Sequence, residues 1–185
     1  VYKRQVYKLC MQRMALEAGI TLYMHSYLSG CVAKEGKIEQ VIIENKNGTE
    51  AISSKMFIDA TGDGDLAYMA GVPMQPREEG VPLQPLSTYF ILAGVDTESP
   101  LINEAMHHKQ GVNCHCLPIR EKLLAMKDEL DMPAFGGPWF CTTLHDGCVA
   151  VNMTRTAADA CDNRDYTRAE CILREDVFRM AEILR

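Results

Sequence analysis

The sequence predicts a mixed α+β (α/β) fold, because helical and strand-like hydrophobic patterns both recur along the chain. Residues 1–18 repeat apolar side chains at helical spacing. Residues 20–60 instead carry short runs of β-branched and aromatic residues that are separated by turn dipeptides. With 185 residues, 47% of them hydrophobic, the chain can bury the core of one domain or of two small ones.

Helix boundaries are marked by residues with known terminal preferences. Gly19 suits the position just past the end of the first helix. In the later part of the chain, one helix is expected from Pro100, with Ser99 as its N-cap, and another from Pro118. Thr167 and Glu170 have the spacing of a capping box and predict the start of the last helix.

Strand signals fall into two groups on either side of a Pro-rich segment at residues 72–86. Strands are expected at residues 20–28, 31–34, 38–45, 49–54, 87–94, 139–144 and 148–153. Tight turns are predicted at Glu35-Gly36, Asn47-Gly48 and Asp146-Gly147. Residues 56–60 are almost fully apolar, which predicts a short strand buried in a larger sheet. Trp139 and Phe140 are expected in the core of the last hairpin.

The most informative segment is residues 57–71, where an apolar run leads into two glycines and then a helix start. Gly62 and Gly64 can adopt positive φ and allow the backbone to approach a ligand closely. Asp63 or Asp65 is expected to cap the helix. Exposed amides at such a turn favour a phosphate or a ribose hydroxyl. The segment indicates a nucleotide-facing turn, with a purely structural helix cap as the alternative.

Three segments resemble one family, the FAD-dependent oxidoreductases related to the fumarate reductase and succinate dehydrogenase flavoproteins. FIDATGDGDLAYMAGVP at residues 57–73 is similar to the family's second nucleotide-contact segment. LCMQRMALEAGITLYMHS at 9–26 resembles the helix and strand before its β-meander, and VNMTRTAADACDNRDYTRAECILRED at 151–176 its return into the FAD domain. The resemblance implies FAD as cofactor, with backbone near Leu28 facing the adenine. It also implies that the following residues line the FAD: Ala60, Thr61, Gly62, Asp63 and Gly64.

The resemblance also implies a domain organisation. Residues 1–71 and 155–185 would form a partial FAD-binding domain, comprising a helix, a β-meander and a buried strand, and residues 72–154 an inserted α+β substrate module. The sequence contains no Gly-x-Gly-x-x-Gly fingerprint of the kind that opens a dinucleotide-binding βαβ unit. We therefore expect the chain to be an internal fragment of a longer flavoprotein that binds FAD, and to be inactive alone.

For catalysis, the resemblance implies hydride transfer between a small anionic organic substrate and the flavin. Such chemistry needs a cation that holds the substrate and a group that moves a proton. Arg155, directly after a predicted strand, and His145, at a hairpin tip, are the candidate catalytic residues. No metal site is expected, because Cys114-x-Cys116 holds its thiols too close for the usual zinc knuckle. The same segment also contains three histidines, His107, His108 and His115.

Composition narrows the possible partners and location. The net charge of −6 argues against a nucleic-acid partner, since phosphate backbones are bound by basic faces. No run approaches the length of a membrane span. Eight cysteines without a Cys-x-x-Cys pair indicate reduced thiols and a cytoplasmic protein. Two other functions stay open: a flavoprotein-derived domain that is not catalytic and binds no FAD by itself, and an unrelated nucleotide-binding α/β domain.

Overall fold

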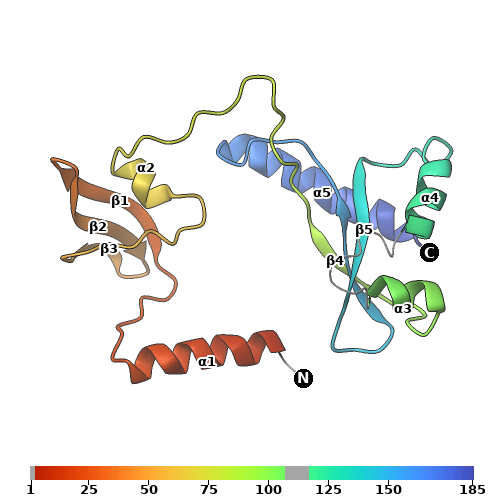
Figure 1. The fold of residues 1–185 in the computed structure, drawn as a ribbon, viewed down its shortest axis with the longest axis horizontal. Helices are drawn as coiled ribbons and strands as arrows, with labels where there is room; N and C mark the ends of the chain where they lie inside the picture. The colour runs from red at the N-terminus through yellow and green to blue at the C-terminus, as the bar shows by residue number, and fades with distance from the viewer. Residues whose placement is uncertain (1–2, 107–116) are drawn as a thin grey trace. The chain divides into compact units, whose positions relative to one another are not determined.

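The computed structural model describes residues 3–106 and 117–185. The chain divides into two compact units, one ending at Glu79 and one spanning Gly80–Arg185 (Figure 1). Each unit contains one antiparallel sheet of three strands. The architecture is therefore mixed helix and sheet, as the sequence predicts.

The first unit contains a helix, a three-stranded meander and a short second helix. These are α1 (Lys3–Glu17), β1 (Tyr27–Lys34), β2 (Lys37–Asn45), β3 (Gly48–Ser53) and α2 (Asp65–Met69). The strand order is β1-β2-β3, so the predicted meander is confirmed. Glu35 and Gly36, the central residues of the β1–β2 hairpin, have positive φ, as a two-residue turn favours. Gly48, which pairs with Asn45 at the end of the β2–β3 turn, also has positive φ.

Helix α1 ends where the sequence predicts. The N–H of Gly19 donates to the Leu16 carbonyl at 3.0 Å, and the N–H of Ile20 donates to the Ala15 carbonyl at 2.9 Å. Gly19 has a φ of 72°, a conformation that a helix end commonly assigns to glycine. The apolar side chains of α1 are exposed, that of Met14 by 64%. The helix is therefore defined by its own hydrogen bonds and not by burial.

Two predicted strands of the first unit are wrong. The strand expected at 20–28 begins only at Tyr27, and His25 ahead of it has a φ of 53°, which interrupts extended backbone. Residues 56–60 pair with no strand among the residues that the structure describes, and Met56 and Ile58 are 78% and 86% exposed. An apolar run forms a strand only where another strand offers hydrogen-bond partners, and periodicity does not report that partner.

The second unit is built on a sheet with the order β4-β6-β5. The strands are β4 (Tyr89–Ala93), β5 (Phe135–Thr142) and β6 (Cys148–Thr154), and the helices are α3 (Pro100–Met106), α4 (Leu117–Ala125) and α5 (Asn163–Ile183). Helix α3 begins at Pro100 as predicted, and the Ser99 carbonyl accepts from the N–H of Asn103 at 2.8 Å. The bulk of the described core belongs to this unit.

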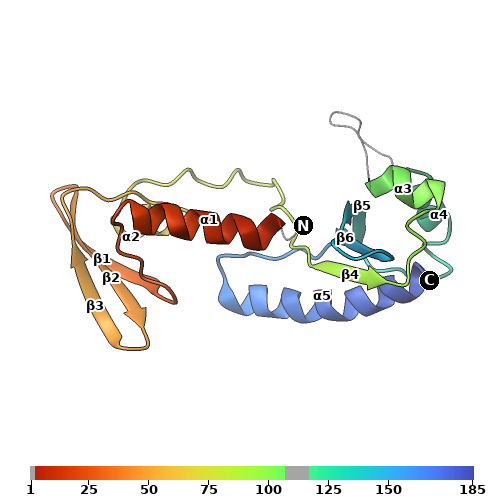
Figure 2. The same cartoon turned by 90° about the horizontal axis from the view of Figure 1, so that it is seen from below.

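One face of the β4-β6-β5 sheet is buried. Phe140 from β5 and Val149, Val151 and Met153 from β6 alternate along their strands and form the centre of the core. Met180 of α5 joins them and is fully buried. Helix α5 lies along this sheet in both views (Figures 1 and 2). Because one face of the sheet is buried, successive side chains of each strand alternate between the core and the opposite face.

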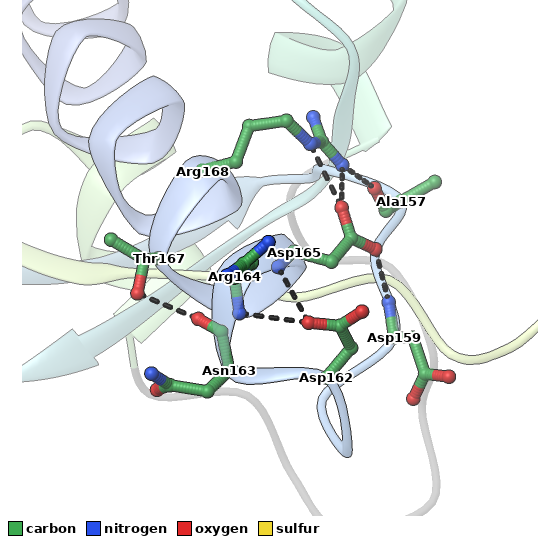
Figure 3. Close-up of polar contacts among 8 residues, drawn as sticks. All are labelled: Ala157, Asp159, Asp162, Asn163, Arg164, Asp165, Thr167 and Arg168. Carbon is green, nitrogen blue, oxygen red and sulfur yellow. Dashed lines mark hydrogen bonds and ion pairs between the residues drawn. The ribbon is translucent and has the colours of Figure 1, made fainter.

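The start of α5 differs from the predicted capping box. The helix begins at Asn163, because the side chain of Asp162 accepts hydrogen bonds from the backbone N–H groups of Arg164 and Asp165 (Figure 3). Thr167 lies inside the first turns, where its hydroxyl donates to the Asn163 carbonyl at 2.7 Å. An aspartate carboxylate that reaches two free amides is a strong N-cap, so the helix extends back to it.

Two pairs on α5, Glu170/Arg174 and Glu175/Arg179, have the i,i+4 spacing that predicts an ion pair, and one of them forms. Glu170 and Arg174 pair across one helical turn. Arg179 does not pair with Glu175, because its guanidinium contacts the carboxylate and the carbonyl of Asp131. Asp131 offers Arg179 two acceptor groups, its carboxylate and its backbone carbonyl, whereas Glu175 could offer only its carboxylate.

Candidate functional site

The turn at residues 57–71 is organised by one carboxylate. Asp59 accepts hydrogen bonds from the Thr61 N–H at 3.0 Å, from the Thr61 hydroxyl at 2.7 Å and from the Ala67 N–H at 2.9 Å. These bonds, led by the one from the Thr61 N–H, lower the pKa of Asp59. The Thr61 hydroxyl in turn accepts from the N–H of Asp65 at 2.9 Å. The start of α2 is thus held by Asp59 and Thr61.

The predicted capping roles of Asp63 and Asp65 are wrong. The residue preceding α2 is Gly64, in a left-handed conformation and without a side chain to cap the helix. Two residues further upstream accept from the free amides of α2 instead: Asp59 from the Ala67 N–H and Thr61 from the Asp65 N–H. These side chains bind the amides at the start of α2 and do not cover the backbone of residues 62–64.

The backbone at the two glycines is accessible. Gly62 has a φ of 101°, and no atom lies within 4 Å of the place where a side chain would begin. The N–H groups of Gly62, Asp63 and Gly64 make no hydrogen bond to any residue that the structure describes. Helix α2 packs against β1, the strand that carries the half-buried Leu28. The predicted cofactor residues therefore belong to contacting elements of the same unit.

Arg155 lies just beyond β6 on a backbone that is fixed on both sides. Its N–H donates to the Ala134 carbonyl at 3.2 Å. The next residue, Thr156, exchanges two hydrogen bonds with Leu86, at 2.9 and 3.0 Å. Because the chain is held by two neighbouring segments at this point, the direction in which the Arg155 side chain leaves the backbone is well defined.

The guanidinium of Arg155 contacts only neutral groups. Its Nη1 donates to Ser87 Oγ at 2.8 Å, to Asn152 Oδ1 at 2.9 Å and to the Thr154 carbonyl at 2.6 Å. The guanidinium carbon lies 5.1 Å from the centre of the Trp139 ring, within the range of a cation–π interaction. No carboxylate pairs with it in the described part of the chain.

The strand beside Arg155 is shaped to admit it. A side chain at Gly136 would begin 2.8 Å from Arg155 Nε, so the guanidinium would have to leave its present position. The register of β5 on β6 shifts between Phe135 and Trp139, which displaces the strand at this point. Burial lowers the pKa of Arg155, which nonetheless stays protonated at neutral pH, because the guanidinium titrates far above it. The site thus holds a half-buried positive charge.

Trp139 is wrongly predicted as core. It is 49% exposed, whereas Phe140 is buried as predicted. Because side chains alternate across a strand, only one of these two neighbours can face the core. The sequence pattern predicts that Trp139 and Phe140 lie in a strand, but it does not tell which of the two faces the core. Sequence patterns do not identify Ser87 and Asn152, which also contact Arg155, because neither belongs to a motif and both meet Arg155 only in the folded chain.

His145 is not near Arg155. It lies exposed in the loop between β5 and β6, where its N–H donates to the hydroxyl of Thr143 at 3.2 Å. Arg155 follows the other end of β6, and a strand of 7 residues spans roughly 20 Å. The structure does not bring the two predicted catalytic residues together. The histidines and cysteines of the rejected zinc cluster, within 107–116, lie outside the described residues.

Comparison with known proteins identifies the family. No curated protein and no solved structure matches the chain. Within residues 3–106 and 117–185, no helix combines the length and apolar composition needed to cross a bilayer. The family model described as FAD dependent oxidoreductase matches residues 1–185. The chain therefore belongs to the FAD-dependent oxidoreductase family.

Proposed function

We propose that this chain forms part of an enzyme that transfers a hydride between a small anionic organic substrate and FAD. The observation that carries the proposal is Arg155, a half-buried cation whose partners are all neutral. Holding a charge away from water without a counter-ion costs free energy, and a bound anion that pairs with the charge would offset this cost. A substrate carboxylate fits this role, because the planar guanidinium pairs with two carboxylate oxygens at once.

The proposed FAD contacts lie along the turn at residues 57–71. The unpaired N–H groups of Gly62, Asp63 and Gly64 are donors suited to phosphate or ribose oxygens. The open space at Gly62 lets a ligand approach the backbone directly. Ala60, Thr61 and Leu28 complete the proposed contact set. When bound, FAD would supply the hydride acceptor or donor, and the residues of this chain would hold the cofactor and the substrate.

The domain roles are part of the same proposal. Residues 1–71 and 155–185 are proposed to belong to the FAD-binding domain, and residues 72–154 to the substrate module. FAD would be bound by a longer protein related to the fumarate reductase flavoproteins, since these 185 residues contain no Gly-x-Gly-x-x-Gly. A cytoplasmic location is proposed from the thiols, because the six described cysteines are free. His145 remains a candidate proton donor that would have to act apart from Arg155.

The family match sets aside an unrelated nucleotide-binding domain. The remaining alternative is a domain of this family that binds no FAD and is not catalytic. The test is the visible flavin spectrum of the full protein, purified with excess FAD, desalted, and then mixed with mono- and dicarboxylates without oxygen. We expect a retained flavin band that one class of carboxylate bleaches. A colourless full protein would establish the alternative.

The role of Arg155 is tested in the same assay by Arg155→Gln. We expect an unchanged flavin band and bleaching about 10- to 100-fold slower, because charge-assisted hydrogen bonds to the substrate are lost. Arg174→Gln is the matched control, since Arg174 is an exposed helix arginine that pairs with Glu170. Equal rates in the two variants would remove Arg155 from the site.

A further inference from the structure

The described helices of the second unit pack on the core side of the β4-β6-β5 sheet, and none of them covers its opposite face. Its residues form three cross-strand rows: Tyr89, Asn152 and Trp139; Ile91, Ala150 and Cys141; Ala93 and Cys148. We call these eight residues the open face. The intervening residues of the same strands, such as Phe90 and Val151, point into or pack against the core. The alternation of strands thus assigns the open face without ambiguity.

The open face is apolar and exposed. Tyr89 is 58% exposed, Ile91 67% and Trp139 49%. Apart from the amide of Asn152, its side chains are hydrocarbon, aromatic or thiol groups. Along the central strand the side chains of Ala150 and Cys148 are small, whereas Ile91 and Trp139 on the outer strands are large. Exposed apolar surface of this kind gains free energy when an apolar partner covers it.

One positive charge lies at one end of the open face. Arg155 stacks on Trp139 and donates to Asn152, so it is joined to the first row. None of the eight residues of the open face is acidic or basic. Arg120, the other arginine near β5, donates to the Gly137 carbonyl at 2.7 Å and stacks on Phe135, outside the three rows. The face therefore offers one anion position followed by uncharged surface.

Resting on the proposed function, we propose that the substrate is an amphipathic monocarboxylate, whose carboxylate pairs with Arg155 and whose apolar body lies along the open face. The three rows span about 13 Å along the strands, since each step of two residues advances about 6.6 Å. A short dicarboxylate fits less well, because its second charge would lie on Ile91, Ala150 and Cys141, where no cation meets it.

Trp139 is the only tryptophan of the sequence and lies in the first row, so its fluorescence reports on this surface directly. The experiment titrates the full chain with decanoate, with decanol as the uncharged analogue and with succinate as the short dianion. We expect a saturable change with decanoate, binding at least about tenfold weaker with decanol, and no change with succinate. This readout does not depend on FAD or on turnover.

Two variants separate the charge from the apolar surface. Arg155→Gln is expected to weaken decanoate about tenfold and leave decanol unchanged. Ile91→Ser is expected to weaken decanoate and decanol alike, by about tenfold, because both lose the same apolar contact. Circular dichroism checks that each variant folds, which is expected of a position as exposed as Ile91.

Each contrary result has a distinct meaning. Succinate that binds as well as decanoate would overturn the amphipathic substrate and leave Arg155 as an anion site, so the proposed function would stand. Decanol that binds as well as decanoate would show that Arg155 does not recognise the carboxylate. The proposed function would then lose its main support as well. Dimerisation of the chain that Ile91→Ser abolishes would assign the open face to a second copy and overturn the inference.

Discussion

The two units of this chain are ordered by different means. Among the described residues, the unit ending at Glu79 buries only two hydrophobic side chains, Ile43 and Leu66, whereas Gly80–Arg185 buries ten, most of them in one cluster. The first unit is held by hairpin turns, by the end of α1 at Gly19 and by the hydrogen bonds of Asp59. All of these join residues that lie close together in the sequence. The second has a core. Local hydrogen bonds can shape a turn such as residues 57–71, but a fixed arrangement of distant residues requires packing.

The candidate sites reflect this difference. The bonds of Asp59 reach at most eight residues along the chain, to Ala67. Those of Arg155 reach Ser87, 68 residues away. We therefore expect the geometry at Arg155 to depend on the stability of the core, and the geometry at Asp59 to depend on the sequence around it.

The largest expected effect tests the core directly. Met153→Ala removes a fully buried side chain from the centre of the second unit and should lower the free energy of unfolding by about 2–5 kcal/mol. Met56→Ala is the matched control, because Met56 is 78% exposed in the first unit, and should change it by less than about 0.5 kcal/mol. Urea denaturation measures both. Equal losses would contradict the contrast between the units.

A second prediction concerns the open turn. Gly62→Val should abolish FAD retention by the full protein, because a side chain would occupy the space at the backbone and would strain a φ of 101°. Gly36→Val is the matched control: Gly36 also has positive φ and open space around it, but lies in the β1–β2 hairpin. Desalting followed by a visible spectrum measures retention. If both variants lose flavin equally, backbone strain alone accounts for the loss.

A third prediction tests the start of α5. Asp162→Ala leaves the N–H groups of Arg164 and Asp165 without their side-chain acceptor and should cost about 1 kcal/mol. Thr167→Ala, at the position that the sequence predicts as the cap, should cost less, because its hydroxyl bonds only within the helix. Thermal unfolding compares the two. A larger loss of stability for Thr167→Ala would indicate that Thr167, and not Asp162, caps the helix.

The smallest expected effects concern how the free energy of unfolding changes with pH. Asp59 in the first unit and Asp176 in the second change it in opposite directions. Hydrogen bonds lower the pKa of Asp59 below 3.8, so its stabilising contribution is present above pH 3.8 and is lost as the pH falls through the folded-state pKa. Burial raises the pKa of Asp176 above 3.8, although Arg179 opposes the shift. Its contribution is therefore present below pH 3.8 and is lost as the pH rises through the raised pKa.

Two variants measure these signs. Asp176→Asn should be more stable than the unmodified protein at neutral pH and lose that advantage in acid, because the neutral amide removes a buried charge. Asp59→Asn should be less stable at neutral pH and converge with it in acid. The free energy of unfolding, followed from about pH 2 to pH 7, gives both curves. Curves of the same sign would contradict the assigned environments.

The sequence by itself determined the features that depend on near neighbours. The meander, the turns at Gly36 and Gly48, the stop at Gly19 and the start at Pro100 all follow from a few adjacent residues. Each is decided by a backbone preference or by a hydrogen bond that closes within one turn. Such preferences act in the same way whatever the rest of the chain does.

Tertiary structure alone decided the features that depend on distant partners. Whether Trp139 or Phe140 faces the core follows from the pairing of β5 with β6, since a shift of one residue exchanges the two faces. Arg179 turns to Asp131 because folding brings a second acceptor into reach. Arg155 becomes a site only where Ser87, Asn152 and Trp139 meet it. Contacts between residues far apart in sequence form only when the core fixes their separation.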